Sequence, residues 1–342
     1  MKILLTGAAG FIGFHTARRL LDDGHELTGI DNLNDFYDVQ LKRDRLQQLV
    51  KHPAFRFHEK DLIDHEFLDG LFGSGRFDRV IHLAAQAGVR DSIERPRIYV
   101  ERNIQCQLNV LECCRHHRIP HLVYASSSSV YGLNAHFPFS VKDNVDHPMS
   151  MYGATKKAGE LMAHSYSHLF QVPTTGLRFF SVYGPWGRPD MALFKFTRNI
   201  LRGEPIDVYN HGDMERDFTY VDDIVEGVVR VMDRIPRPDP EWDAAAPAPD
   251  RSSAPYRLYN IGSNAPVRLM DFITEIERNL GLEAKKNLLP MQIGDIPKSH
   301  ADVSELMADI GYAPRTTVAQ GVKAFVDWYL EYYEVPRAGS RH

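Results

Sequence analysis

The strongest constraint on the fold of this chain is the alternation of short apolar runs with longer amphipathic segments between Lys2 and about Phe180. A buried parallel strand is almost continuously apolar because helices cover both faces of its sheet, and Ile3-Leu4-Leu5 fits this description. The segments expected to form strands are Lys2–Thr6, Glu26–Ile30, Phe55–Glu59, Arg79–Leu83, His121–Ser126 and Thr174–Phe179. The pattern predicts an α/β protein with a Rossmann-type, doubly wound parallel sheet.

The second half of the chain differs in the length of its predicted elements and in its content of glycine and proline. After Phe180 the elements become shorter and glycine and proline more frequent, which suits a smaller α/β lobe on the C-terminal side that closes over the strand ends. We expect a Rossmann domain over residues 1–180 and the smaller lobe mainly over 181–335, with some C-terminal segments returning to the first domain. The proline- and alanine-rich stretch Pro236–Pro255 is expected to be a surface insertion before a strand around Leu258–Ile261.

Composition excludes several classes of protein. The chain has 342 residues, with 40 Lys and Arg against 45 Asp and Glu, and this net charge of −5 does not favour nucleic acid or an acidic membrane as a partner. No apolar run reaches about 18 residues, so no membrane span is expected. The three cysteines, Cys106, Cys113 and Cys114, are odd in number and lack metal-type spacing, which favours a reducing, cytoplasmic location and no metal site.

A glycine-rich loop follows the first predicted strand directly, and a helical pattern continues from it through Leu21. Glycines permit a tight turn and a close backbone approach, so a pyrophosphate can rest on the helix N-terminus. A glycine triplet alone is weak evidence, but its position between a strand and a helix predicts a dinucleotide site. The residues expected there are Gly7, Gly10, Phe11, Ile12 and Gly13.

Two acidic residues extend this site. Asp31 ends the second strand, where a carboxylate can accept both hydroxyls of an adenosine ribose and would repel a 2′-phosphate. The expected cofactor is therefore NAD rather than NADP. Asp61 and Leu62 follow the third strand and are placed to meet the adenine edge, although Asp61 could equally cap a helix.

Tyr152 and Lys156 lie four residues apart at the start of a helical segment, so the phenol and the ammonium share one face. A nearby Lys⁺ and the nicotinamide charge favour the phenolate, which lets a tyrosine of ordinary pKa about 10 act as a base closer to neutral pH. Taken alone, a tyrosine and a lysine four residues apart are usually just neighbours on the surface of a helix. The fifth strand, however, ends in four serines, 126–129, whose hydroxyls can bond a sugar oxygen and the tyrosine. The combination predicts a Tyr/Lys-type catalytic site.

These motifs, in this order, resemble the extended short-chain dehydrogenase/reductase family over nearly the whole chain. The resemblance is carried by Gly7–Gly13, His82-Leu83-Ala84-Ala85, Asn103, Ser127, Tyr152-x-x-x-Lys156 and Arg216-Asp217-Phe218. That family acts chiefly on nucleotide sugars. The resemblance implies that residues 82–85 and Asn103 line the NAD pocket, that Ser127 assists Tyr152, and that Lys156 also holds the nicotinamide ribose. Cys106 departs from the pattern, since many relatives carry glycine there.

The resemblance is closer to the UDP-glucuronate 4-epimerases. It is carried by Gly29-Ile30-Asp31-Asn32-Leu33-Asn34, by Gln86-Ala87-Gly88-Val89-Arg90 and by the long run from Arg178 to Ala192. A uronate carries a carboxylate as well as a diphosphate, so its site needs additional donors. The resemblance implies a carboxylate near the serine hydroxyls and Ser181, with Arg188 and Arg216 nearer the nucleotide. The residues expected at the substrate are Arg90, Ser127, Ser128, Ser129, Ser181, Arg188, Arg216 and Asp295, and Asn32 is expected at the cofactor.

The expected reaction is an NAD-dependent 4-epimerisation of UDP-glucuronate to UDP-galacturonate through a 4-keto intermediate, with Tyr152 as the base. A UDP-glucuronate decarboxylase that forms UDP-xylose and a 4-epimerase of another UDP-sugar are the enzymatic alternatives. Ser129 stands where dehydratases and decarboxylases of the family usually have an acidic residue, which favours the epimerase. A non-catalytic dinucleotide-sensing protein on the same fold is the alternative from another class, and the intact Tyr152 and Lys156 argue against it.

A homodimer is implied by the same resemblance. The segments Pro96–His117 and Tyr152–Leu169 would form a four-helix bundle between two copies. Their apolar faces could instead be the ones that pack on the sheet, so both arrangements stay open.

Overall fold

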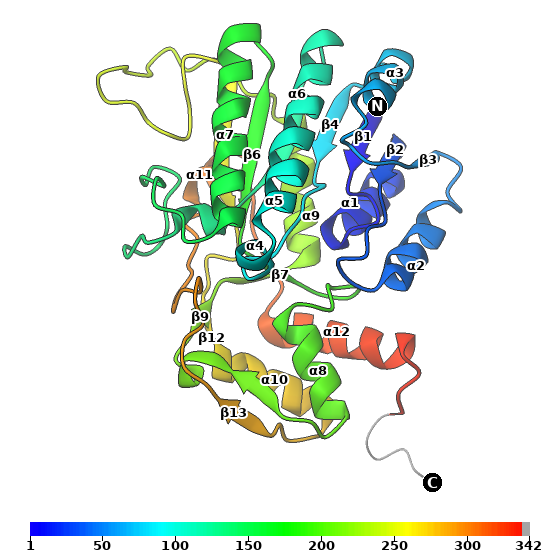
Figure 1. Cartoon of the computed structure of the whole chain (residues 1–342), viewed down its shortest axis with the longest axis vertical. Coiled ribbons are helices and arrows are strands. Elements are labelled where there is room, and N and C mark those ends of the chain that lie inside the picture. Colours follow the sequence, from blue (N-terminus) through cyan, green and yellow to red (C-terminus); the bar gives the residue numbers. More distant parts are fainter. Residues whose placement is uncertain (337–342) are drawn as a thin grey trace.

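The computed structural model describes residues 1–336, and its main body is a seven-stranded parallel sheet (Figure 1). The strand order is β11-β6-β5-β4-β1-β2-β3. The strands are β1 (Lys2–Thr6), β2 (Glu26–Asp31), β3 (Phe55–Glu59), β4 (Arg79–His82), β5 (Leu122–Ser127), β6 (Thr174–Phe179) and β11 (Tyr256–Ile261). The predicted α/β class and doubly wound parallel sheet are confirmed, and the six predicted strands agree with the structure to within one residue at each end.

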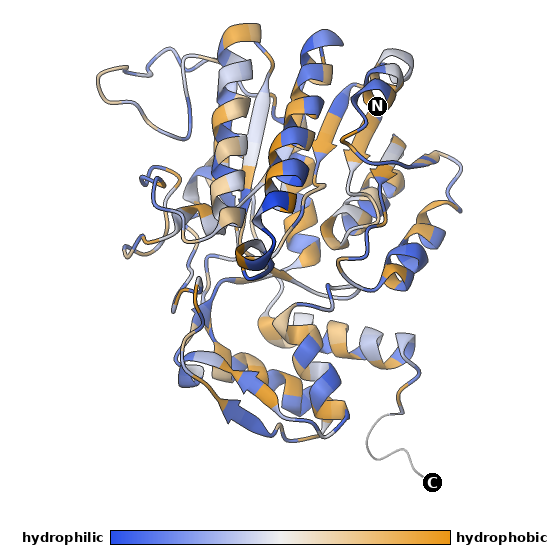
Figure 2. Ribbon diagram, in the orientation of Figure 1, coloured by the Kyte–Doolittle hydropathy of each residue, from blue (hydrophilic) through white to orange (hydrophobic). Residues whose placement is uncertain are grey.

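Helices cover both faces of this sheet, as its near-continuous apolar strands require. One face is covered by α1 (Phe11–Asp22), α9 (Val221–Asp233) and α11 (Ser304–Ile310), and the other by α3 (His65–Gly75), α6 (Cys106–His116) and α7 (Met151–Phe170). Each face has its own hydrophobic core, with Phe14 and Val228 in one and Leu68 and Val110 in the other. Figure 2 shows apolar and hydrophilic residues alternating along α6, as expected for a helix with one buried face.

A smaller lobe lies beyond the carboxyl ends of the strands (Figure 1). Its helices are α8 (Ala192–Leu201), α10 (Leu269–Leu280) and α12 (Val318–Tyr332). They pack around a separate core, in which the rings of Phe218 and Phe272 stack at 3.9 Å between centroids. Three strand pairs complete this region: β7 (Ser181–Tyr183) with β10 (Phe218–Tyr220), β9 (Glu215–Arg216) with β12 (Val267–Arg268), and β8 (Ile206–Val208) with β13 (Lys286–Leu288).

The chain returns to the large sheet after building part of the smaller lobe. Strand β11 pairs in parallel with β6, in a register that runs from Tyr256 opposite Thr174 to Ile261 opposite Phe179. The stretch Pro236–Pro255, which was expected to be an insertion, contains no helix or multi-residue strand and connects α9 to β11, as the yellow loop in Figure 1. The two lobes are therefore interleaved in sequence.

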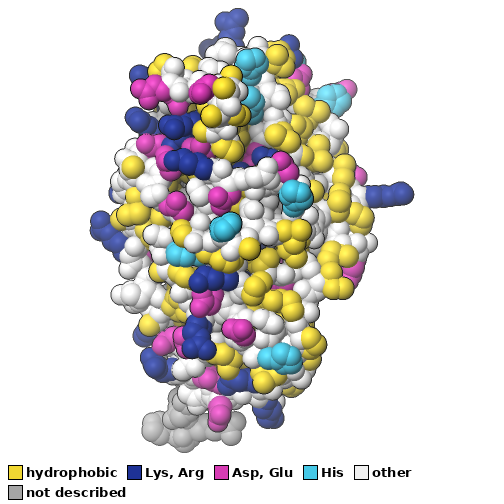
Figure 3. Space-filling model, turned by 90° about the vertical axis from the view of Figure 1, so that its left-hand side faces the viewer, with side chains coloured by type: hydrophobic (Ala, Val, Ile, Leu, Met, Phe, Trp, Pro, Cys, Tyr) yellow, Lys and Arg dark blue, Asp and Glu magenta, His cyan; other side chains and the backbone are white. Residues whose placement is uncertain are grey.

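The remaining elements are short helical segments that connect the larger ones. They are α2 (Val39–Leu49), α4 (Asp91–Glu94), α5 (Pro96–Tyr99), a π-helical segment η1 (Val100–Gln105), and the 3₁₀ segments η2 (Ser128–Tyr131) and η3 (Tyr209–Gly212). Across residues 1–336, no helix is both long and apolar enough to cross a membrane. On the face shown in Figure 3, acidic, basic and hydrophobic side chains are interspersed.

Candidate active site

A cleft of about 890 Å³ opens where the carboxyl ends of the parallel strands face the smaller lobe. This is the position at which ligands bind in open α/β sheets. The predicted site residues that line the cleft are Gly7, Gly10, Phe11, Ile12, Gly13, Asp31, Asn32, Asp61, Leu62, Leu83, Ala84, Ala85, Arg90, Ser127, Ser128, Ser129, Tyr152, Lys156, Ser181, Arg188 and Asp295. The fold thus brings together residues that are separated by almost 290 positions in the sequence.

Three predicted residues do not line the cleft. Asn103 is buried behind its wall, where its side chain bonds the backbone of Gln86 in both directions, at 2.8 and 3.0 Å, and donates to Thr155 Oγ1 at 3.0 Å. His82 points to Thr6 Oγ1 at 2.7 Å and is likewise buried. Arg216 lies behind a residue of the cleft wall, because its Nη2 donates to Oδ1 of the cleft residue Asp295 at 2.8 Å. Asn103 and His82 were expected to line the pocket, but both lie behind its wall: Asn103 holds the Gln86 backbone and His82 contacts the Thr6 hydroxyl.

The glycine loop between β1 and α1 fits a diphosphate. A Cβ on Gly13 would lie 1.9 Å from the Gly7 carbonyl oxygen, and Gly7 itself has φ +73°, so side chains are excluded at both positions. Helix α1 begins after Gly10 without a side-chain cap, which leaves its first N–H groups free to bind an anion. These features are those that a dinucleotide cofactor requires.

Asp31 and Asp61 flank the far end of this loop. Asp31 accepts hydrogen bonds from the backbone N–H groups of Ala9 (3.1 Å) and Leu33 (2.9 Å), and burial raises the pKa of its carboxyl. Asp61 is bound by Asn32 Nδ2 at 2.9 Å and by Arg102. The alternative role of Asp61 as a helix cap is wrong, because Asp64 caps α3 by accepting from the Phe67 N–H.

We expect the protein to bind NAD at least about tenfold more tightly than NADP, because a 2′-phosphate beside the Asp31 carboxylate meets a like charge at close range. Replacing Asp31 with alanine should remove most of this preference. Calorimetric titration of the cofactor-free protein with each dinucleotide measures it. Asp91→Ala, which removes another carboxylate of the same cleft, is the control and should keep the preference. Equal affinity of the unsubstituted protein for the two cofactors would refute this role of Asp31.

The predicted catalytic pair stands at the start of α7. Ser150 caps this helix by accepting from the Gly153 N–H at 3.0 Å, so Tyr152 and Lys156 occupy its first two turns and both line the cleft. Lys156 Nζ donates to the Ala125 carbonyl at 2.8 Å. Burial lowers the pKa of Lys156 to about 8, and Glu160 acts in the opposite direction. The ammonium therefore stays mostly protonated at neutral pH.

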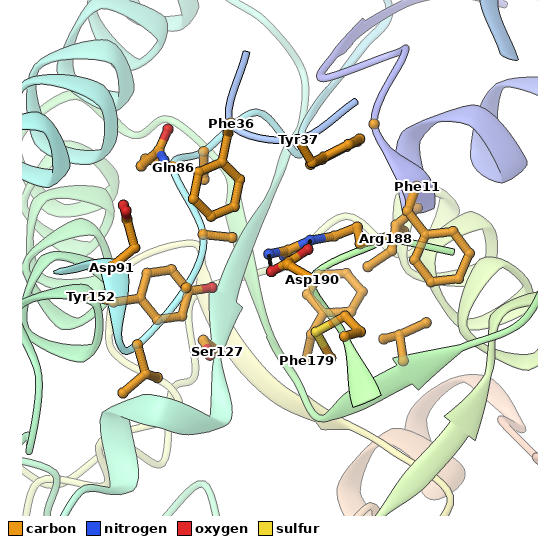
Figure 4. Close-up of a pocket in the computed structure, with 18 of the residues that line it drawn as sticks. Phe11, Phe36, Tyr37, Gln86, Asp91, Ser127, Tyr152, Phe179, Arg188 and Asp190 are labelled. Carbon is orange, nitrogen blue, oxygen red and sulfur yellow. Dashed lines mark hydrogen bonds and ion pairs between the residues drawn. The ribbon is translucent and has the colours of Figure 1, made fainter. Parts of the chain in front are cut away.

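The electrostatics of Tyr152 differ from the sequence-based expectation. Burial raises the pKa of its phenol, and the groups that oppose this are the Ser127 hydroxyl and the Arg188 guanidinium. We expected Lys156 to supply the neighbouring positive charge. In this structure the Lys156 ammonium donates to the Ala125 carbonyl, and its effect on the phenol stays a prediction. Arg188, which was expected nearer the nucleotide, is a cation directed toward the phenol (Figure 4).

A buried charge pair supports the floor of the site. Glu160, one turn beyond Lys156 on α7, accepts from Arg178 Nε at 2.8 Å and from Arg178 Nη2 at 2.9 Å, and both side chains are fully buried. The same carboxylate accepts from Ser126 Oγ at 2.6 Å. Burial alone would raise the pKa of Glu160, but the charge of Arg178 holds it below its usual value. This pair ties β5, β6 and α7 together directly beneath the serine cluster.

The smaller lobe contributes charged groups at the opposite wall. Arg188 donates two hydrogen bonds to the Asp190 carboxylate. The Asp295 carboxylate lies between two arginines, 2.8 Å from Arg216 Nη2 and 3.8 Å from Arg90 Nη2. Sequence reasoning did not identify the lining residues Phe36, Tyr37, Lys42, Asp190 and Tyr209 as members of the site. Lys42 lies in the short helix α2, and Tyr37 lies just before it. The sequence pattern of such a helix does not indicate which of its residues will line a cleft.

A family model matches residues 3–244 of the chain, under the description "NAD dependent epimerase/dehydratase family". The chain belongs to this family of enzymes. The predicted resemblance to the extended short-chain dehydrogenases/reductases is thereby confirmed.

Particular relatives narrow the comparison. The chain is 56% identical to the protein CapI of Staphylococcus aureus, over 98% of this chain and 100% of the relative. It is 48% identical to a probable UDP-glucuronate 4-epimerase of Rhizobium meliloti, over 97% of this chain and 98% of the relative. Among solved structures, it is similar to the UDP-glucuronic acid 4-epimerase of Bacillus cereus in complex with UDP-glucuronic acid and NAD. That likeness has a TM-score of 0.86 and 33% identity, and it covers 97% of this chain and 100% of the other.

Proposed function

We propose that this protein is an isomerase that converts UDP-glucuronate to UDP-galacturonate, with NAD as a tightly held cofactor and a 4-keto sugar as the transient intermediate. The observation that carries the proposal is the meeting of Tyr152, Ser127 and Lys156 in the cleft that also contains the bare glycine loop and Asp31. The relatives named above, of which one is a UDP-glucuronate 4-epimerase solved with that sugar nucleotide and NAD, support the choice of substrate and cofactor.

In this proposal the large lobe holds NAD at the glycine loop, Asp31 and the strand ends, and the smaller lobe holds most of the nucleotide sugar. NAD, when bound there, would supply the acceptor and donor for the hydride of sugar C4. Tyr152 takes the proton of the 4-hydroxyl and later gives it back, and Ser127 bonds the same oxygen. Lys156 holds the ribose beside them. Closure of the cleft by the smaller lobe excludes water from the keto sugar.

The serine cluster at the end of β5 explains why we propose an epimerase rather than a decarboxylase. Ser127 Oγ accepts from the Ser129 N–H at 3.1 Å, so η2 starts immediately after the strand and presents Ser128 and Ser129 to the cleft. With Ser181 these hydroxyls offer neutral donors to a uronate carboxylate. A carboxylate that is held in this way cannot rotate perpendicular to the ketone plane, which is the orientation that loss of carbon dioxide requires.

We also propose a homodimer and a cytoplasmic location. In η1 and α7, Val100, Leu161 and Leu169 expose 43%, 57% and 65% of their surfaces, and all three lie in the predicted bundle segments. Burying them against a second copy would remove this apolar surface from water. The free, buried cysteines 106, 113 and 114 suit a reducing compartment.

The redox balance of the reaction gives a direct test of this function. Because the hydride leaves and returns within one turnover, the purified protein should carry NAD and convert UDP-glucuronate without added cofactor. Absorbance at 340 nm should stay flat while product accumulates. A continuous rise of free NADH with turnover would show a net dehydrogenase and would refute the proposal.

A further inference from the structure

Arg188 reaches into the cleft from the loop that joins β7 to α8, and about a fifth of its side chain is exposed. Figure 4 shows its guanidinium and the Tyr152 hydroxyl directed toward each other, with the Asp190 carboxylate lying against the guanidinium. The charge of Arg188 favours the phenolate of Tyr152, against the effect of burial. The position of this one guanidinium therefore matters for the group that exchanges the proton.

Asp190 binds Arg188 along one edge. Arg188 Nε donates to Asp190 Oδ1 at 3.0 Å, and Arg188 Nη2 donates to Asp190 Oδ2 at 2.6 Å. A two-point contact of this kind fixes the plane of a guanidinium as well as its place. The remaining nitrogen, Nη1, has no hydrogen-bond partner among residues 1–336, so it is free for a ligand in the cleft.

The backbone of this loop is held by other contacts. Arg45 Nη2 donates to the Trp186 carbonyl at 2.6 Å, and the Met191 N–H donates to the Arg188 carbonyl at 3.1 Å. Asp190 also exposes about 30% of its side chain, so its carboxylate is not part of a packed core. Loss of the Asp190 carboxylate should therefore leave the loop backbone in place and release only the Arg188 side chain.

We propose that Asp190 is a positioning residue: it holds the Nε and Nη2 edge of Arg188 so that Nη1 faces the Tyr152 hydroxyl and the sugar oxygen that reacts there. The inference rests on the proposed function for the identity of that sugar. It also has a consequence for specificity. Because Asp190 occupies the Nε and Nη2 edge of Arg188, a uronate carboxylate cannot bind at that edge, and the serine cluster offers it further donors.

A double-mutant cycle on Arg188 and Asp190 tests this inference. Asp190→Ala should lower kcat at least about tenfold, since misplacing a group that acts in the transition state costs rate, whereas KM should change less than about threefold. The kcat of Asp190→Asn should lie between those of the unsubstituted protein and Asp190→Ala, because the amide oxygen can still accept one hydrogen bond from Arg188. In an Arg188→Ala background, Asp190→Ala should cause no further loss, because the residue on which it acts is gone. Glu275→Ala, which removes the partly buried carboxylate bound to Arg278 on α10 and outside the cleft lining, is the control and should keep full activity.

The outcomes of this cycle distinguish an effect of Asp190 through Arg188 from an effect on the loop itself. A loss from Asp190→Ala that persists in the Arg188→Ala background, or that comes with a lower melting temperature, would mean that Asp190 acts on the loop and not through Arg188. Full activity of Asp190→Ala would also overturn the inference. If the unsubstituted protein does not epimerise UDP-glucuronate, the proposed function fails. The same cycle is then run on the UDP-sugar that the protein does turn over, and the coupling between the two residues still decides the inference.

Discussion

Replacing Tyr152 with phenylalanine is expected to lower kcat by at least about 100-fold, the usual scale for removing general acid–base help, while the protein keeps its fold and its NAD. The substitution deletes one oxygen and no packing surface. The ring still lies edge-on against Tyr99, with 6.1 Å between centroids, and the helix cap at Ser150 is untouched. The measurements are steady-state rates with UDP-glucuronate and the NAD content of the purified variant.

Tyr99→Phe is the matched control, because it deletes a hydroxyl from the neighbouring ring. The Tyr99 hydroxyl donates to Asp91 Oδ2 at 2.9 Å and does not line the cleft. Its loss should change kcat less than about threefold. If Tyr152→Phe retained activity within a few-fold of the unsubstituted protein, Tyr152 would not be the residue that exchanges the proton.

The second large effect is expected from Glu160→Ala, which should destabilise the protein by about 3–5 kcal/mol. The reason is that Arg178 would remain fully buried with its charge unpaired, and Ser126 would lose its acceptor. Because the pKa of Glu160 is lowered in the folded state, this stabilisation is present above about pH 4.3 and is lost as the pH falls through the folded-state value. Urea unfolding at pH 7 measures the change in the free energy of unfolding.

Two further variants interpret that result. Glu275→Ala breaks a pair with Arg278, whose side chain is largely exposed, and should cost less than about 1 kcal/mol. Replacing both Glu160 and Arg178 with apolar residues of similar size should recover part of the stability, because no charge is then left unpaired. A Glu160→Ala variant that is no less stable than Glu275→Ala would show that the buried pair does not support the site floor.

The fold could be predicted because its signals are local. A buried parallel strand such as Lys2–Thr6 is recognisable by its apolar run, and the glycine loop marks the turn into α1. The return of the chain to the sheet at β11 was less certain from the sequence, because a strand's pairing partner depends on which edge of the sheet is open. Only the assembled sheet shows that β6 provides that edge.

The site was predicted where its residues carry their chemistry in a fixed spacing, as Tyr152 and Lys156 do. It was missed where the role depends on a distant partner. The Arg188 guanidinium is directed toward the Tyr152 hydroxyl from a separate loop, and no spacing in the sequence indicates this neighbour. Asn103 matches a family motif, yet its side chain is turned away from the cleft to hold Gln86. A motif identifies such a residue as important without saying what it contacts.

The measurement that tests the central claim most directly is the identity of the product formed from UDP-glucuronate. Mass spectrometry at partial conversion separates six-carbon from five-carbon sugar nucleotides, and NMR of the same sample identifies the configuration at C4. We expect UDP-galacturonate with very little UDP-4-keto-pentose, because in the proposed function the serine hydroxyls of residues 128, 129 and 181, which line the cleft, hold the carboxylate. A product that is mainly pentose, or recovery of unchanged UDP-glucuronate from NAD-loaded protein, would contradict the assignment of this chain as a UDP-glucuronate 4-epimerase.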